Sequence, residues 1–318
     1  GTVDMSPGLS QDLRFYPDGT PMTNGTAVSL NASYRGLGFP LSAHLSQGFY
    51  TNPDGIADDI DPYYLSSNLG TDASFELQEN LVGLGPLSYN SSVSATWLWR
   101  FDGPVRLDRR GLTFNFGLSL SWGRANWVAN TKRGLSASLS NSYIKYLRDG
   151  SFVADVDGSL SNYLSYEGIF SAKSRFQAFW RVLGGQRLDV GGALRGVIDA
   201  RVDGDAGIFA NFDMPIKLFD FPSHVVLGRN WLDFELQASP FLDLALVRPF
   251  PSSNLGAENL WAAGGLEVLA YPLGMRSFII RASLGFDLRS VAESRSLTAN
   301  TRDGTKPYEV FIGLGLFY

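Results

Sequence analysis

The chain has 318 residues and a formal net charge of −5, and 44% of its residues are hydrophobic. It has no cysteine, which excludes disulfides and zinc–thiolate sites, and its acidic balance argues against a nucleic-acid binder with a basic surface. No run of eighteen apolar residues is present, so we expect no transmembrane helix. The 35 glycines and 13% aromatic residues favour many strands joined by turns.

Apolar and polar residues alternate along most of the chain, as in strands with one apolar face. In chain order, the expected strands are residues 25–36, 40–50, 73–84, 91–101, 112–123, 133–146, 152–166, 169–182, 206–218, 236–248, 261–271, 276–289 and 308–318. Residues 9–17 are a candidate for one more strand. The alternation is strictest in 112–123, 206–218, 276–289 and 308–318.

The two faces of these strands favour a membrane barrel over a soluble sandwich. One face carries Leu, Phe, Ala, Val and Ile, whereas the other carries mainly Ser, Asn and Gly. A soluble sandwich would expose many Lys, Glu and Thr, whereas small polar residues suit a crowded lumen. We therefore predict an all-β transmembrane antiparallel barrel of about 14–16 strands. Residues 1–24 would form an N-terminal segment and residues 25–318 the barrel; a soluble sandwich or barrel is the alternative.

The lengths of the connections indicate an orientation and a location. If the last strand ends in the periplasm, the long connections 51–72, 183–205 and 290–306 fall on the outer side, as in outer-membrane barrels. The exception is the connection 219–235, which would hold a short segment outside the barrel. We therefore expect the chain to lie in the lipid bilayer of a bacterial outer membrane.

An ordered set of motifs occupies the second half of the chain. A Gly-Gly pair and a Leu-Arg-Gly triplet form a loop motif that comprises Gly191, Gly192, Leu194, Arg195 and Gly196. A Gly-Asp pair follows, then a strand with an Asn-x-acid pattern, then the segment FLDLALV; these contain Gly204, Asp205, Asn211, Asp213 and Asp243. The segment 262–288 reads as a glycine-containing hairpin.

Over residues 132–318 this set resembles the BamA/TamA-type barrels of the outer-membrane assembly superfamily, the bacterial surface antigens. Val197 replaces the aromatic residue that follows Arg-Gly in that family, and Ala245 replaces a glycine. The resemblance implies an inward-folded outer loop whose Arg195 pairs first with Asp243 and second with Asp213. A guanidinium offers a fork of donors that a carboxylate can accept bidentately. Such a lock could either stiffen a plug or control passage through the lumen.

The last strand carries Gly313 and Gly315 and ends on Tyr318. In the family that this chain resembles, the seam between the first and last strands opens sideways to receive or release a client strand. Glycine weakens strand packing and allows close backbone approach, so the resemblance implies such a seam here. The alternative is that small residues are needed in a crowded lumen.

The same resemblance implies a role in outer-membrane protein insertion or protein export. Only about 24 residues precede the first clear strand, so we expect no POTRA modules, and partner proteins would supply the periplasmic part. Two alternatives remain: a passive channel for small polar solutes, and a structural platform for a protein complex.

Other chemistry finds little support in the sequence. The acidic segment 52–64 contains Asp54, Asp58, Asp59 and Asp61, but its spacing does not match a calcium loop, so we expect a solvated loop and no metal site. His44 lies among serines, yet nothing supplies an oxyanion hole, and the other histidine is His224. We expect no enzyme activity, no cofactor and no nucleic-acid partner.

Overall fold

The alternating pattern forms long antiparallel strands. The computed structural model describes residues 2–15, 21–37, 39–51, 63–100, 111–128, 130–166, 169–185, 193–197, 202–221, 233–251, 255–272, 278–297 and 306–316. Within these ranges the chain builds one 15-stranded sheet, in agreement with the predicted number of strands. No helix in this part of the chain has the length and apolar character needed to span a bilayer.

The strands follow one another in space as they do in sequence, except that β10 and β11 both pair with β9 and β12. The first nine are β1 (Val3–Phe15), β2 (Pro21–Tyr34), β3 (Leu41–Thr51), β4 (Tyr63–Gln78), β5 (Leu87–Arg100), β6 (Gly111–Val128), β7 (Thr131–Tyr146), β8 (Phe152–Tyr166) and β9 (Phe170–Leu183). The others are β10 (Ala206–Asp213), β11 (Ile216–Phe221), β12 (Phe234–Arg248), β13 (Leu260–Pro272), β14 (Phe278–Asp287) and β15 (Tyr308–Leu316). A 3-10 turn, η4 (Ala257–Asn259), precedes β13, and helix α3 (Leu288–Ser294) follows β14.

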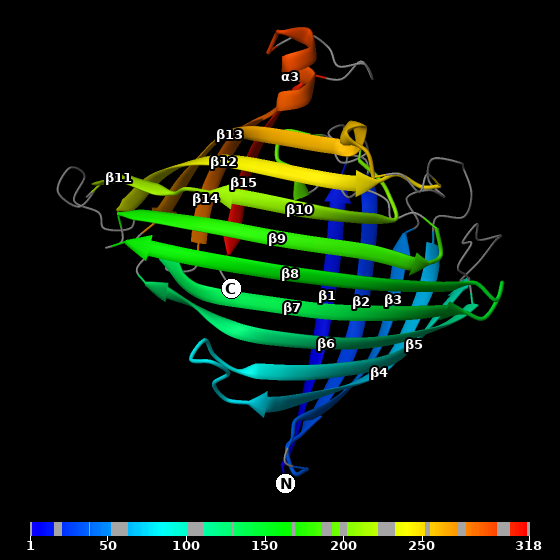
Figure 1. The fold of residues 1–318 in the computed structure, drawn as a ribbon. Coiled ribbons are helices and arrows are strands. Elements are labelled where there is room, and N and C mark those ends of the chain that lie inside the picture. The colour runs from blue at the N-terminus through cyan, green and yellow to red at the C-terminus, as the bar shows by residue number, and fades with distance from the viewer. Residues whose placement is uncertain are drawn as a thin grey trace.

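The sheet is strongly rolled. Figure 1 shows β1, β2 and β3 running behind β6–β9, while α3 projects beyond the strands. The described pairings run from β1 to β15, and none of them joins β1 to β15. The boundary that we expected between residues 24 and 25 falls inside β2, and β1 pairs with β2 along its length. The described residues near the N-terminus therefore belong to the same sheet as the rest.

Strand register keeps one polar and one apolar face around the sheet. Ser94 of β5 lies opposite Asn115 of β6, and their side chains are hydrogen-bonded at 3.3 Å. Large apolar side chains of the other parity are exposed on most strands, including Leu9, Val28, Leu45, Leu69, Val93, Phe116, Leu139, Leu160, Phe176, Ile208, Leu242, Leu266, Ile280 and Ile312. The polar face therefore points inward and the apolar face outward.

The structure corrects several of the expected strand boundaries, since β1 begins at Val3, β2 begins at Pro21 and β6 extends to Val128. The strand expected at 73–84 is β4, which begins at Tyr63, inside the connection expected at 51–72. It ends at Gln78, before a turn in which Val82 and Gly83 adopt positive φ angles of 57° and 75°. The strand expected at 206–218 is broken between β10 and β11, where Pro215 has no N–H to donate to a ladder. The strand expected at 276–289 is β14, which ends at Asp287, and α3 begins directly after it at Leu288 and extends into the connection expected at 290–306.

Candidate functional site

Part of the connection between β9 and β10, including residues 193–197 and Val202, lies inside the rolled sheet. Leu194 and Val197 are each 1% exposed, and they pack against residues of β9, β10, β12 and β13. The buried members of this cluster are Phe179, Leu194, Val197, Val202, Phe209, Ala245, Val247 and Ala263. The largest apolar cluster of the described residues therefore holds the loop inside the rolled sheet.

Gly196 lets this loop approach the wall very closely. Its φ angle is +93°, and a Cβ added there would lie 2.5 Å from the carbonyl carbon of Gly285 on β14. Its backbone N–H also donates a hydrogen bond of 3.0 Å to Oε2 of Glu309 on β15. Only glycine combines this backbone conformation with so close a contact.

Arg195, at the tip of the loop, is held by two carboxylates of the wall. Its Nε and Nη2 donate to the two oxygens of Asp243 at 2.9 and 2.8 Å, and its backbone N–H donates to Asp243 at 2.9 Å. Its Nη1 donates to Asp213 at 2.5 Å. Asp243 is 0% exposed and Asp213 is 9% exposed, so these charge-assisted hydrogen bonds are largely shielded from water.

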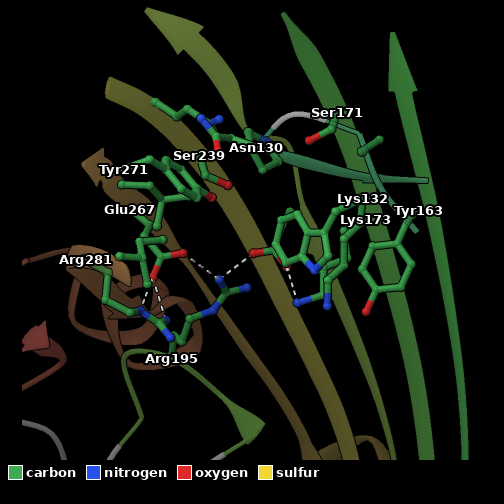
Figure 2. A pocket seen from close by; sticks show the side chains of 17 residues that line it. Asn130, Lys132, Tyr163, Ser171, Lys173, Arg195, Ser239, Glu267, Tyr271 and Arg281 are labelled. Atoms are coloured by element: carbon green, nitrogen blue, oxygen red, sulfur yellow. Dashed lines mark hydrogen bonds and ion pairs between the residues drawn. The ribbon is translucent and has the colours of Figure 1, made fainter. Parts of the chain in front are cut away.

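The structure adds five partners that the sequence did not reveal. Asn211 donates to Asp243 at 2.9 Å, and the Phe241 ring lies 3.9 Å from the Arg195 guanidinium carbon. Glu267 lies 3.8 Å from Arg195 Nη1 and binds Arg281 at 2.8 Å through Nε. Lys173 lies 3.5 Å from Asp213. Figure 2 shows Glu267, Arg281 and Lys173 around Arg195.

Charge in this network is balanced. Three cations, Arg195, Lys173 and Arg281, face three acids, Asp213, Asp243 and Glu267. Burial lowers the pKa of the Arg195 guanidinium, but its hydrogen bonds to Asp243 and its attraction to Asp213 raise that pKa overall. Leaving a charge buried without its partner is costly, so the loop tip and the wall stabilise each other.

The other predicted site residues are more scattered. Asp205 accepts two hydrogen bonds from Arg248, at 2.6 and 2.9 Å, next to the return of the loop. Gly313 and Gly315 lie in β15 opposite Arg281 and Ile279 of β14. Several residues of our predictions lie outside the described part of the chain: Gly191, Gly192, Tyr318, His224, Asp54, Asp58, Asp59 and Asp61.

His44 does have a partner on the polar face. Its Nδ1 lies 3.3 Å from Asp72, and the Ser42 hydroxyl also donates to Asp72, at 3.4 Å. The Ser42 hydroxyl is thus directed to Asp72, and the described hydrogen bonds include none from a serine to the other nitrogen of His44. Among the described residues, no group of three His, Cys, Asp or Glu side chains could hold a metal ion.

Comparison with known proteins addresses the fold. No protein-family model and no curated protein sequence matches the chain. Among solved structures, CdiB from Acinetobacter baumannii has a TM-score of 0.59 at 11% identity, covering 99% of this chain and 54% of CdiB. BamA from Haemophilus ducreyi lacking POTRA domains 1-3 has a TM-score of 0.58 at 13% identity, covering 99% of this chain and 70% of BamA. The chain has the fold of the BamA and CdiB barrels.

CdiB from Escherichia coli gives the same result, with a TM-score of 0.55, 11% identity, and coverage of 92% of this chain and 53% of CdiB. The predicted antiparallel β-barrel and its resemblance to the BamA/TamA-type barrels are thereby confirmed at the level of the fold. The chain spans about half the length of the two CdiB chains. In this barrel the loop carrying Arg195 lies inside, against β9, β10, β12 and β13.

Proposed function

We propose that the chain is an integral outer-membrane barrel that acts in protein insertion or protein export, with partner proteins supplying the periplasmic part. The observation that carries this proposal is the inward-folded loop, whose Arg195 is bound to Asp243 and Asp213. In this proposal the Arg195 network acts as a lock, by which we mean that it holds the loop inside the barrel and keeps the lumen closed to small solutes. The lumen stays closed until a substrate polypeptide, the client, binds. The fold shared with BamA and CdiB supports the same class of function.

The outward face supports a position in lipid. Leu69 and Leu139 are 60% and 54% exposed, and similar side chains follow on neighbouring strands. A continuous exposed apolar surface of this extent would promote aggregation in water, whereas a bilayer requires it. The lumen face of the same strands is polar, as the 2.7 Å hydrogen bond between Ser138 and Ser159 illustrates.

Two neighbouring residues of β7 test which face meets lipid. Leu139→Arg should destabilise the barrel in lipid vesicles by about 2–4 kcal/mol, because it places a cation in the apolar part of the bilayer. Ser138→Arg, one residue away on the lumen face, should lower the free energy of unfolding far less. Urea titrations of folding into vesicles would measure both. Equal losses for the two variants would contradict the assigned faces.

A passive channel is the second candidate, and the polar half of the lumen favours it. On β4–β6, Asn68 donates to Thr96 at 2.7 Å, and Asn115 donates to Ser94 at 3.3 Å. Such neutral groups suit the passage of water and small polar solutes. The buried loop cluster and the Arg195 lock, which occupy the opposite wall, favour the assembly-type function instead.

The proposed activity can be tested with the protein isolated from its own membrane. A tagged chain should retain partner proteins after mild extraction, and the resulting assembly in vesicles should speed the folding of a denatured outer-membrane barrel at least about tenfold over empty vesicles, or about 1.4 kcal/mol in the barrier. Assemblies with Arg195→Ala would show whether the lock matters for this step. If the isolated assembly speeds no client and instead passes sugars and amino acids freely, the channel is the better account.

A further inference from the structure

A cavity of about 360 Å³ lies inside the barrel beside the Arg195 lock. Figure 2 shows its two sides: Lys132, Lys173 and Tyr163 gather on one, and Arg195, Glu267 and Arg281 on the other. Ser239 and Tyr271 complete the wall. The cavity has the volume of a small organic molecule rather than that of a single water.

Two buried polar atoms of this wall have no hydrogen-bond partner in the described part of the chain. They are Oε1 of Gln237 and Oγ of Ser239, and both residues are only 1% exposed. The Gln237 amide nitrogen donates to Glu235 at 2.6 Å, which leaves its oxygen as a free acceptor. Because buried polar groups without partners are costly and rare, we expect these two atoms to bind either water or a ligand.

Lys132, on the opposite side of the cavity, contacts aromatic rings but forms no ion pair with a described carboxylate. Lys132 Nζ lies 4.7 Å from the Trp127 ring centre and 5.6 Å from that of Tyr163, and the described carboxylates form no ion pair with it. Lys173 contacts Asp213 at the rather long distance of 3.5 Å, and its side chain is 39% exposed. The aromatic rings hold the Lys132 ammonium without neutralising it. This side of the cavity is therefore suited to an anion.

We propose that this cavity binds a small aromatic carboxylate that carries an N–H or O–H donor. The carboxylate of the ligand would lie between Lys132 and Lys173. The aromatic ring of the ligand would stack on the side chains of Trp127 and Tyr163, which line this side of the cavity. The donor would reach Gln237 Oε1, and the Ser239 hydroxyl would complete the polar contacts. This site is assigned from the cavity alone and does not depend on a role in protein insertion.

N-acetyl-tyrosine is a suitable probe, since it combines a carboxylate, an amide N–H and an aromatic ring. Calorimetric titration of the detergent-solubilised full chain should show binding at about 1 mM or tighter. N-acetyl-tyrosinamide, which has the same shape but no charge, should bind at least about tenfold more weakly, and so should N-acetyl-tyrosine with Lys132→Met. Absence of binding to the natural chain up to about 10 mM, or equal affinity for acid and amide, would overturn the proposal.

Ser239→Ala separates a ligand site from a merely hydrated gap. If the Ser239 hydroxyl has no partner until a ligand binds, the variant should bind N-acetyl-tyrosine several-fold more weakly. The urea midpoint of the ligand-free variant should then equal or exceed that of the natural chain. If permanent water serves the hydroxyl, the variant should unfold at lower urea and bind the probe as the natural chain does. The second pattern would contradict the proposed contact.

Discussion

Asp243→Asn should be among the most destabilising single changes in this barrel. Asp243 is fully buried and accepts hydrogen bonds from the Arg195 backbone, the Arg195 guanidinium and Asn211. The substitution keeps the shape but removes the charge and turns an amide N–H₂ toward existing donors. We expect a loss of about 3–5 kcal/mol, because the buried Arg195 charge loses its main partner. Urea unfolding from lipid vesicles would measure it.

A second ion pair of the wall provides the matched control. Asp155 accepts from Arg181 at 2.7 and 3.2 Å, in the same bidentate manner, but this pair joins two neighbouring strands, β8 and β9. Asp155→Asn should therefore cost distinctly less than Asp243→Asn. Losses of the same size would mean that Asp243 contributes only as an ordinary ion pair of the wall.

Gly196→Ala should release the loop from the lumen. The methyl group would meet the Gly285 backbone at 2.5 Å, and the φ angle of +93° disfavours any residue with a Cβ. The left-handed conformation alone costs roughly 1–2 kcal/mol, and the overlap with backbone atoms cannot be relieved by a rotamer change. We therefore expect the loop tip to leave the wall and take Leu194 and Arg195 with it.

The chain has no cysteine, so one introduced thiol can report this release. In a Leu194→Cys background, where residue 194 is 1% exposed, maleimide should react slowly; adding Gly196→Ala should raise the rate at least about tenfold. Gly185→Ala is the control, since Gly185 has a φ of +83° but nothing within 4 Å of an added Cβ. Labelling that stays slow with Gly196→Ala would show that the loop tolerates the methyl group.

Most of the strands could be predicted because a period of two is visible in the sequence itself. The pattern in β6, with Phe114, Phe116 and Leu120 on one parity, needs no tertiary information. Strand ends were harder to predict. Glu79 and Asn80 follow Gln78, but apolar residues resume at Leu81 and Val82, and the positive φ angle of Val82 places them in a turn and not in the strand. The sequence pattern of a strand also does not show which other strands it pairs with, as for β11, which pairs with both β12 and β9.

The candidate site could be predicted in part from the same alternation of polar and apolar residues. Parity placed Asp213 and Asp243 on the polar face, and the Leu-Arg-Gly triplet singled out Arg195; the structure brings these three side chains together. Glu267 and Arg281 also share the polar parity of adjacent strands, so the same pattern identifies them as lumen-facing partners. The contact of Gly196 with Glu309 depends on how the loop folds back across 113 residues of sequence, so no local pattern predicts it.

Conductance of single barrels in planar lipid bilayers tests the central claim, a lumen closed by the Arg195 lock, most directly. The natural chain should show near-zero baseline current, because in this account the loop lies within the lumen and Arg195 holds its tip against the wall. Arg195→Ala should show frequent, larger openings, since the loop tip then loses its hold on Asp243 and Asp213. A large, steady current that is the same in both proteins would contradict the lock and support a passive channel.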